Sequence, residues 1–212
     1  MPEATREIPG PAGPLEVLIE KPSGTVRAAA VFAHPLPTQG GTMHTKCVFQ
    51  ATKALARIGC VVLRFNFRGV GRSAGAWDEG RGELDDFRAG VDFMAAQYPG
   101  VELWAAGFSF GAYVALTAGA EDDRICALIG IAPPINRYDF SAAKKSTKPK
   151  FIIHGEADEL IPLKQVREFY AQLADPKELV EIDRANHLFD GQVGEVGDAL
   201  EELLADFTCR TQ

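Results

Sequence analysis

The sequence predicts an α/β fold built on a mostly parallel, doubly wound sheet with an antiparallel hairpin at its N-terminal edge. Short apolar runs, rich in small and β-branched residues, alternate with segments of helical spacing along most of the chain. Glycine and proline separate these runs at fairly regular intervals, and no internal repeat interrupts the pattern. Strands that alternate with helices in this way are typical of a parallel sheet with helices on both faces.

The expected elements begin with a hairpin at residues 4–8 and 15–21, joined by the turn-rich PGPAGP. The strands that follow are expected at residues 27–33, 60–67, 101–108, 125–132, 150–155 and 178–183. The helices are expected at residues 42–58, 83–97, 110–120, 163–173 and 193–207. Parallel sheets of this kind bind ligands at the carboxyl ends of their strands, so the residues after each apolar run are the candidates for chemistry.

The composition fits one globular domain over residues 1–212, because the chain is 46% hydrophobic and long enough to bury a sizeable core. The formal charge of -7 disfavours a nucleic-acid partner, since phosphate binding needs clustered Lys and Arg. The basic KKSTKPK stretch at residues 144–150 is interpreted as a solvated loop. Because no apolar signal segment and no run near the ~18 apolar residues of a membrane span are present, a soluble cytoplasmic protein without a membrane partner is expected.

The cysteines and histidines show no metal-binding spacing. Cys47, Cys60, Cys126 and Cys209 lie far apart without a CxxC pattern and mostly in apolar stretches, so all four are expected to be reduced structural thiols. The histidines show neither HxH nor HExxH spacing, and no GxGxxG follows the first parallel strand. The sequence therefore predicts no metal site and no cofactor.

Two GxSxG patterns compete for the role of a nucleophile elbow, GRSAG around Ser73 and GFSFG around Ser109. The elbow is a sharp strand-to-helix turn whose glycines remove Cβ atoms that would collide. Ser109 directly follows the strand at 101–108 and opens the helix at 110–120, whereas no helix immediately follows Ser73. Ser109 is therefore the candidate nucleophile, and Ser73 is interpreted as part of a structural turn.

Several stretches together resemble the α/β-hydrolase superfamily. They are GFSFGA around Ser109, NFRGVGRS at 66–73, HGEADELIP at 154–162 and ANHLF at 185–189. The HPLPTQGGTMHTK stretch at 34–46 is similar to the HP…GGTMHNK-type segment of the small lidless bacterial esterase-like group. The likeness extends from about residue 15 to residue 207 and implies an α/β-hydrolase fold.

A serine hydroxyl needs an adjacent base, and the triad of this fold runs in the order Ser, Asp or Glu, His. This order removes His34 and His44, which precede Ser109. His154 lies at a strand end ahead of the best acid, where a packed or loop-bonding histidine is expected. His187 lies in the loop before the last helix, from which it can reach across the strand ends, and it is the candidate base. Whether His44 lines the pocket or caps its helix is left open.

For the acid, the superfamily pattern of a glycine, a short turn and an aspartate points to Asp158. The structural alternative is an aspartate that caps the turn before the helix at 163–173. Asp183, at the end of the eighth strand, is a weaker rival. In the catalytic interpretation, Asp158 holds one tautomer of the His187 imidazole and stabilises the imidazolium.

Acyl transfer builds negative charge on the substrate oxygen, which two backbone N–H groups usually stabilise. The Phe110 N–H follows the nucleophile and opens a helix whose dipole favours an anion. In HPLP, Pro35 and Pro37 have no N–H, so Leu36 is the candidate second donor. The structural alternative is a rigid connection before the helix at 42–58.

The stretch at residues 133–149 is too short for the multi-helix cap that many hydrolases of this fold insert there, so no large cap domain is expected. A shallow, open site should favour short or small acyl groups. The candidates for its walls are Phe108, Phe110, Tyr113, Trp77, Leu36 and Ile161. Each of these side chains suits the core at least as well.

The expected function is that of a serine carboxylesterase, which hydrolyses small esters through an acyl-enzyme on Ser109. A thioesterase, a lactonase or a small peptidase would use the same residues. A catalytically silent binding module on the same fold is the alternative from another class, although such a protein has no need of Ser109, Asp158 and His187 together. The expected partner is a small-molecule ester, and the residues give no indication of the oligomeric state.

Overall fold

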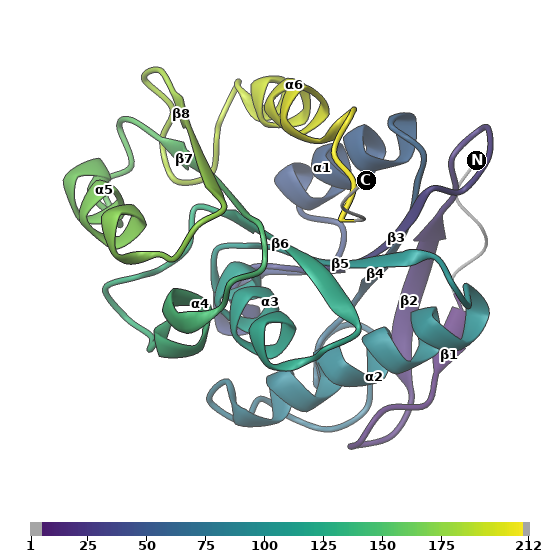
Figure 1. Cartoon of the computed structure of the whole chain (residues 1–212). Coiled ribbons are helices and arrows are strands. Elements are labelled where there is room, and N and C mark those ends of the chain that lie inside the picture. Colours follow the sequence, from purple (N-terminus) through teal and green to yellow (C-terminus); the bar gives the residue numbers. More distant parts are fainter. Residues whose placement is uncertain (1–5, 210–212) are drawn as a thin grey trace.

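An eight-stranded sheet runs through the computed structural model, which describes residues 6–209 (Figure 1). Its strand order is β1-β2-β4-β3-β5-β6-β7-β8. The strands are β1 (Arg6–Ile8), β2 (Leu15–Glu20), β3 (Ala28–Ala33), β4 (Cys60–Phe65), β5 (Glu102–Phe108), β6 (Ile125–Ile131), β7 (Lys150–Gly155) and β8 (Lys177–Ile182). Strands β3 to β8 pair in parallel, whereas β1 pairs antiparallel with β2 and β2 with β4. The predicted fold class is therefore confirmed, although residues 4–5 of the predicted hairpin lie outside the described residues.

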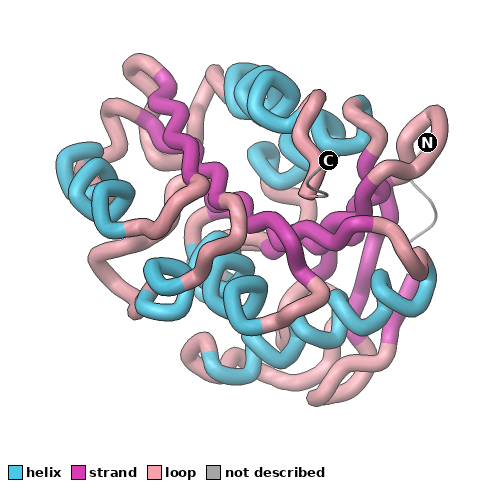
Figure 2. The backbone as a smooth tube through the Cα atoms, viewed as in Figure 1, coloured by secondary structure: helices cyan, strands magenta, loops and turns pink. Residues whose placement is uncertain are grey.

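Six α-helices among the described residues cover the two faces of the sheet, and a short 3-10 helix, η1 (Pro37–Gln39), follows β3. The α-helices are α1 (Lys46–Arg57), α2 (Arg81–Gln97), α3 (Phe110–Glu121), α4 (Ser141–Lys145), α5 (Leu163–Gln172) and α6 (Val193–Leu204). Figure 2 shows the strands as one continuous twisted layer, with α1 and α6 on one face and the other helices opposite. Within residues 6–209, none of the helices combines the length and the apolar character that a membrane span requires.

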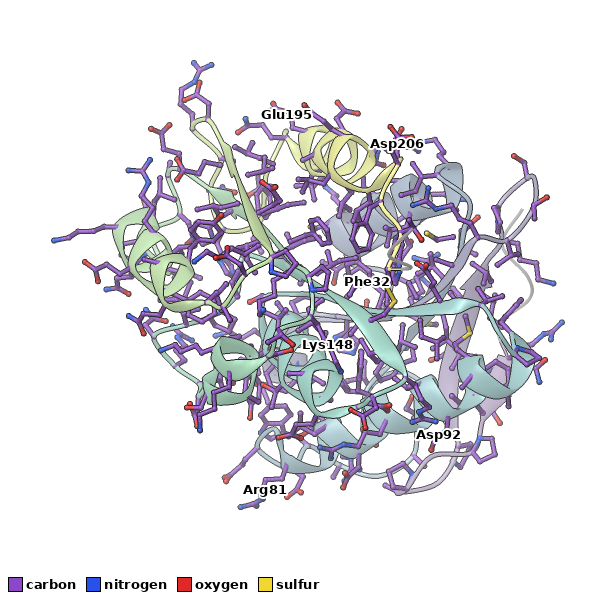
Figure 3. All side chains as sticks on the ribbon, in the orientation of Figure 1. Phe32, Arg81, Asp92, Lys148, Glu195 and Asp206 are labelled. Atoms are coloured by element: carbon purple, nitrogen blue, oxygen red, sulfur yellow. A yellow bond between two sulfur atoms is a disulfide. The ribbon has the colours of Figure 1, made fainter. Side chains whose placement is uncertain are left out.

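The two faces of the sheet bury two separate cores, and side chains alternate between them along each strand. On β3, Val31 packs into the core under α2 and α3, whereas its neighbour Phe32 packs into the core under α1 and α6. All six residues of β3 are buried, which explains its continuous apolar run. Figure 3 shows Phe32 inside the molecule and charged side chains such as Arg81 and Glu195 at its outer surface.

Helix α1 begins four residues later than predicted, because residues 42–45 form a turn instead of helix. The Thr45 N–H bonds to the Thr42 carbonyl oxygen at 3.0 Å, and the Thr42 N–H bonds to the Thr45 hydroxyl at 3.2 Å. These side-chain and turn hydrogen bonds compete with helical ones.

The basic stretch at residues 144–150 differs from the predicted solvated loop. Lys144 and Lys145 form the end of α4, a short helix that the sequence did not predict. Lys150 opens β7 with only 1% of its surface exposed, and its Nζ donates to three backbone carbonyl oxygens. Lys148 donates to two carbonyl oxygens at the end of α3. These acceptors satisfy charges that would otherwise be costly to bury.

The prediction that all four cysteines are reduced is wrong for two of them. Cys126, near the start of β6, and Cys209 form a disulfide with Cα atoms 5.9 Å apart. Cys47 and Cys60 are buried thiols as predicted, and burial raises the pKa of both. At the end of α6 the chain turns back onto the same face of the sheet, where the Arg27 guanidinium donates to the carbonyl oxygens of Leu204, Ala205 and Phe207. This return of the chain brings the two cysteines together.

Candidate active site

Ser109 lies at a sharp turn between β5 and α3, at the carboxyl edge of the sheet. Its φ of 52° and ψ of -120° lie in a region that residues with a Cβ rarely adopt, at a cost of order 1–3 kcal/mol. The flanking glycines make the turn possible. A Cβ on Gly107 would lie 2.1 Å from the Gly111 carbonyl oxygen, and a Cβ on Gly111 would lie 2.2 Å from the Ala33 carbonyl oxygen. The structure thus has the strained strand-to-helix turn that GFSFG predicts.

Ser73, in the second GxSxG pattern, is a buried structural residue. Its hydroxyl donates to the Asn66 carbonyl oxygen at 2.6 Å and accepts the Glu16 N–H at 2.9 Å. With 7% of its surface exposed and its hydroxyl used both as donor and as acceptor, Ser73 has no free group to offer a substrate. Its interpretation as part of a structural turn is confirmed.

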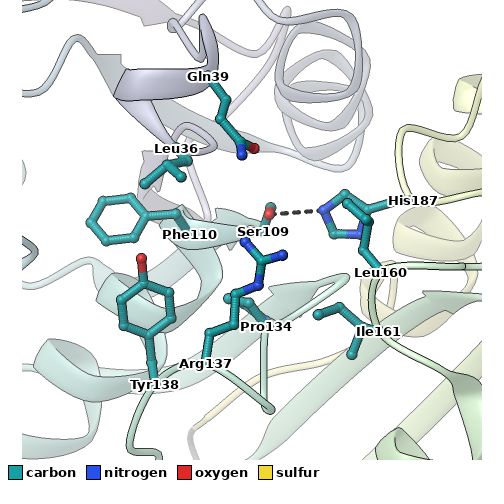
Figure 4. Close-up of a pocket in the computed structure, with 10 residues that line it drawn as sticks. All are labelled: Leu36, Gln39, Ser109, Phe110, Pro134, Arg137, Tyr138, Leu160, Ile161 and His187. Atoms are coloured by element: carbon teal, nitrogen blue, oxygen red, sulfur yellow. Dashed lines mark hydrogen bonds between the residues drawn. The ribbon is translucent and has the colours of Figure 1, made fainter.

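The Ser109 hydroxyl meets the imidazole of His187, which comes from the loop between β8 and α6 (Figure 4). Ser109 Oγ lies 2.9 Å from His187 Nε2, and His187 Nδ1 lies 2.7 Å from Oδ2 of Asp158, just past β7. Because the carboxylate accepts from Nδ1, that nitrogen carries the proton and Nε2 is left as an acceptor for the hydroxyl. The fold therefore brings together three groups from three strand ends.

Asp158 is held as an oriented anion. Its Oδ1 accepts the Leu160 and Ile161 N–H groups, both at 2.9 Å, while Oδ2 faces His187. Burial alone would raise the pKa of Asp158. The hydrogen bond from His187, the charge of that ring when protonated and the Ile161 N–H outweigh this effect and hold the pKa below its usual value. The carboxylate thus caps the turn before α5 and also orients His187, so the two roles considered for it are not exclusive.

Two neighbouring titratable groups make other contacts. His154 is fully buried at the end of β7, where its Nε2 donates to the Ile161 carbonyl oxygen at 2.8 Å and lies 3.4 Å from Asp158 Oδ2. Burial is the main cause that lowers the pKa of His154, and the ring is the loop-bonding histidine that was expected. Asp183 is exposed, with Oδ2 3.1 Å from Nε of Arg184.

His34 fixes the direction of the peptide that follows it. Its Nε2 accepts the Phe67 N–H at 3.1 Å, so Nδ1 carries the proton and donates to the Pro35 carbonyl oxygen at 2.7 Å. The Pro35 carbonyl and the Leu36 N–H belong to one planar trans peptide and point in opposite directions. The hydrogen bond therefore also sets where the Leu36 N–H points. Burial lowers the pKa of His34 to about 4 and keeps the ring neutral.

Further along, the same segment is tied to β4. The Met43 N–H donates to Asn66 Oδ1 at 2.9 Å, and the Met43 carbonyl oxygen accepts from the buried Arg64 guanidinium at 2.9 Å. Gly41 has no room for a side chain, since a Cβ there would lie 2.1 Å from the Pro35 carbonyl oxygen. The segment from His34 to Met43 is thus held at several points.

The Leu36 and Phe110 N–H groups make no hydrogen bond within the described part of the chain. Phe110 is the first residue of α3, so its N–H has no partner within the helix. Both residues line the same pocket as Ser109. Two donors therefore remain available in the pocket that holds the Ser109 hydroxyl.

The pocket beside Ser109 has a volume of about 30 Å³ (Figure 4). It is lined by Leu36, Gln39, Ser109, Phe110, Pro134, Arg137, Tyr138, Leu160, Ile161 and His187. Leu36, Phe110 and Ile161 were expected as its walls. The sequence does not indicate Arg137 and Tyr138 as wall residues, because only the length of the loop after β6 is informative.

Three expected wall residues lie behind the pocket instead. Phe108 is fully buried, with its ring centroid 5.8 Å from that of His187. Tyr113 and Trp77 pack against Phe110, at ring-centroid distances of 6.1 Å and 5.2 Å. These side chains pack behind His187 and Phe110 and do not line the pocket themselves.

Two further residue sets have no part in this pocket. His44 is exposed in the turn before α1 and does not line the pocket, and the N-cap residue of α1 is Thr45. Glu102, Cys126 and Cys209 bring possible metal-ligand atoms within 4.8 Å of one another. Because the two sulfurs are joined in the disulfide, they are not thiolate ligands.

Comparison with known proteins places this arrangement in a family. The profile of the serine aminopeptidase S33 family matches residues 25–139, which include Ser109. The uncharacterized protein RP471 of Rickettsia prowazekii is 33% identical over 204 residues, which cover 92% of this chain and 86% of the relative.

Two solved structures are similar over nearly their whole length. An α/β serine hydrolase homologue from Coxiella burnetii is 36% identical, with a TM-score of 0.92 over 96% of this chain and 98% of that chain. XC6422 from Xanthomonas campestris, a member of the α/β serine hydrolases without lid, is 39% identical, with a TM-score of 0.90 over 99% of this chain and 96% of that chain. Here too, the connection between β6 and β7 holds only the short α4. The chain therefore belongs to the serine aminopeptidase S33 family of α/β hydrolases, in the group of serine hydrolases without a lid.

Proposed function

We propose that the protein is a serine carboxylesterase that hydrolyses small or short-chain esters through an acyl-enzyme on Ser109. The observation that carries the proposal is the hydrogen-bonded series from Ser109 Oγ through His187 to Asp158, at 2.9 and 2.7 Å. These distances are those of a nucleophile in contact with its base and of a base oriented by an acid. Ser109, Asp158 and His187 follow three strands of a single sheet, which supports one catalytic domain.

In the proposed reaction, Ser109 Oγ attacks the ester carbonyl carbon while His187 Nε2 takes the hydroxyl proton. The tetrahedral intermediate collapses when His187 gives this proton to the leaving alcohol, and the acyl group stays on Ser109. A water molecule then repeats the two steps, with His187 again as base, and releases the acid. Asp158 remains an anion throughout and stabilises the imidazolium. None of these steps needs a metal or a cofactor.

The Leu36 and Phe110 N–H groups are the proposed oxyanion hole. Each is free to donate, and the N-terminus of α3 adds a favourable dipole behind Phe110. Removing a single donor of this kind typically costs about 3 kcal/mol of transition-state stabilisation. Because the His34 ring and the peptide planes hold the Leu36 donor in advance, little reorganisation is needed when the charge develops.

The size and charge of the pocket support small esters. A volume of about 30 Å³ leaves room for only a small group beside Ser109. An aminopeptidase needs an anionic partner for the substrate ammonium group. The pocket beside Ser109 is lined by Arg137 and by no carboxylate, whereas Glu159 lines the adjoining hollow that shares Leu160 and His187. The positive charge of Arg137 favours an ester over a peptide whose free N-terminus would enter this pocket.

A fluorophosphonate probe followed by intact-mass measurement tests the nucleophile. We expect one adduct on the wild-type protein, none on Ser109→Ala, and an unchanged adduct on Ser73→Ala and on the exposed control Ser141→Ala. Folding of each variant is checked by circular dichroism, because Ser73 is buried. No adduct on the folded wild-type protein would favour the silent binding module and refute the proposal.

A series of 4-nitrophenyl esters tests the size of the acyl group. We expect kcat/KM to be highest for acetate to butyrate and to fall with longer chains. A preference for chains above about ten carbons would contradict the small pocket.

A further inference from the structure

Arg137 supplies a positive charge to the pocket beside Ser109. The only other lining residues with ionisable side chains are Tyr138 and His187. Figure 4 shows its guanidinium extending from the loop after β6 toward the Ser109 hydroxyl. A guanidinium in this position would lie beside the substrate group that is attached to the scissile ester bond.

The exposed Arg137 guanidinium has no hydrogen-bond or ion-pair partner within residues 6–209. Each of the other arginines from Arg27 to Arg184 has a side-chain hydrogen bond or ion pair, and most are paired with a carboxylate. The carboxylate next to Arg137 in sequence, Asp139, is used elsewhere. It accepts the Ser141 N–H at 2.9 Å and the Ser141 hydroxyl at 2.5 Å. In a protein with a net charge of -7, an arginine left without a carboxylate is available to an anionic ligand.

The backbone that carries Arg137 is held in place on both sides. Nδ2 of Asn136 donates to the Leu160 carbonyl oxygen at 3.1 Å, which ties this loop to the opposite wall of the pocket. Tyr138 stacks on Tyr113 with ring centroids 4.4 Å apart. The Arg137 N–H itself donates to the Pro134 carbonyl oxygen at 3.0 Å. The guanidinium is thus presented from a fixed point, which lowers the entropy cost of binding a ligand.

We propose that Arg137 binds a carboxylate group of the substrate, so that the preferred substrates are small esters that carry a free carboxylate near the scissile bond. The inference rests on the proposed esterase function and adds the class of substrate to it. A guanidinium offers two parallel N–H donors that match the two oxygens of a carboxylate, which makes the contact both strong and directional. The same charge would give no advantage to a neutral ester of equal size.

The test compares esters that differ only in charge. One pair, 4-acetoxybenzoate and 4-acetoxybenzamide, places the charge on the leaving alcohol. A second pair, monoethyl glutarate and its monoamide, places it on the acyl group. Each is assayed in a pH-stat with the wild-type protein, Arg137→Gln, Arg137→Lys and a matched control, Arg184→Gln. Arg184 is exposed in the loop that precedes His187 and does not line the pocket.

We expect the wild-type protein to prefer the carboxylate member of at least one pair. Arg137→Gln should lower kcat/KM for that ester by about 10- to 100-fold, the range typical of hydrogen bonds to charged groups. The neutral member should change by less than about threefold, since Arg137 takes no part in the proton transfers. Arg137→Lys should keep part of the preference, and Arg184→Gln should keep all of it. Equal loss for charged and neutral esters, or no preference in either pair, would overturn the inference.

The outcomes separate this inference from the proposed function. If neutral esters are hydrolysed and the fluorophosphonate adduct forms, but charge has no effect, only the role of Arg137 fails. If the wild-type protein neither hydrolyses esters nor forms the adduct, the esterase proposal fails. In that case, calorimetric titration of Ser109→Ala with glutarate tests Arg137 alone. Binding that disappears in Ser109→Ala/Arg137→Gln supports the carboxylate site, and no binding overturns it.

Discussion

Substitutions of His34 should separate effects on catalysis from effects on stability, because its two ring nitrogens make two different hydrogen bonds. Nδ1 donates to the Pro35 carbonyl oxygen and Nε2 accepts the Phe67 N–H. An Asn side chain places its amide near the position of Nδ1, and a Gln side chain reaches the position of Nε2. His34→Asn therefore keeps the donor to Pro35, and His34→Gln keeps the acceptor for Phe67.

The effect on catalysis follows from the peptide that carries the Leu36 N–H. If His34→Gln releases the Pro35 carbonyl, the opposite end of the same peptide loses its fixed direction. Loss of one oxyanion donor costs about 3 kcal/mol, so kcat should fall by about 100-fold. His34→Asn should stay within about tenfold of the wild-type protein, while the unpaired, buried Phe67 N–H should lower its free energy of unfolding by about 1–3 kcal/mol.

The pH dependence of stability gives an independent measure of the same side chain. The folded protein lowers the pKa of His34 from 6.5 to about 4, so the unfolded chain binds the proton first as the pH falls. The contribution of His34 to the free energy of unfolding is complete above pH 6.5 and is lost as the pH falls from 6.5 to 4. At 1.36 kcal/mol per pKa unit, this loss amounts to about 3 kcal/mol for the wild-type protein, and it should be missing in His34→Gln and His34→Asn.

The assays are kcat with 4-nitrophenyl acetate and urea unfolding at pH 7, 5.5 and 4.5. If His34→Asn and His34→Gln lose the same activity, the Pro35 bond does not position the Leu36 donor. If the free energy of unfolding of both variants falls between pH 7 and 4.5 as steeply as that of the wild-type protein, His34 is not a buried neutral ring that gains a proton on unfolding.

Three other changes should follow from the geometry. Asp158→Asn should lower kcat by about 10³- to 10⁴-fold, because it disturbs the tautomer of the base; a loss below tenfold would place the orienting group elsewhere. Gly41→Ala puts a Cβ 2.1 Å from the Pro35 carbonyl oxygen and should lower kcat/KM at least tenfold. The control Gly24→Ala should leave kcat/KM unchanged, because no atom lies within 4 Å of its Cβ and its φ is not positive. Cys126→Ser should lower the free energy of unfolding by about 2–4 kcal/mol in urea, because it opens a loop of 83 residues; an equal midpoint under non-reducing conditions would contradict the disulfide.

Much of the fold could be predicted from the sequence because local and long-range patterns agree. The runs of β3 to β7 are buried on both faces, so each is largely apolar and is bounded by glycine, proline or polar residues, whereas the edge strand β8 is mostly only half-buried or exposed. The elbow was also predictable. GFSFG directly joins a strand to a helix, and two of its glycines are sterically required. By contrast, α4 is only five residues long and carries no periodic signal.

The features that could not be predicted depend on contacts between distant segments. Cys126 and Cys209 are 83 residues apart, and no spacing rule pairs them until the chain after α6 has folded back. The position of the Arg137 backbone is set by a hydrogen bond of Asn136 and by ring stacking of Tyr138, which an exposed loop does not show in its sequence. For His34, the position beside Pro35 was the available signal, but its hydrogen bonds depend on the approach of β4.

A crystal structure of the protein after reaction with a small alkyl fluorophosphonate would test the proposed catalytic centre most directly. We expect phosphorus bonded to Ser109 Oγ, His187 Nε2 within hydrogen-bond distance of the adduct, and the phosphoryl oxygen about 2.7–3.1 Å from the Leu36 and Phe110 nitrogens. An adduct on another residue, or a phosphoryl oxygen that points away from both N–H groups, would contradict the mechanism.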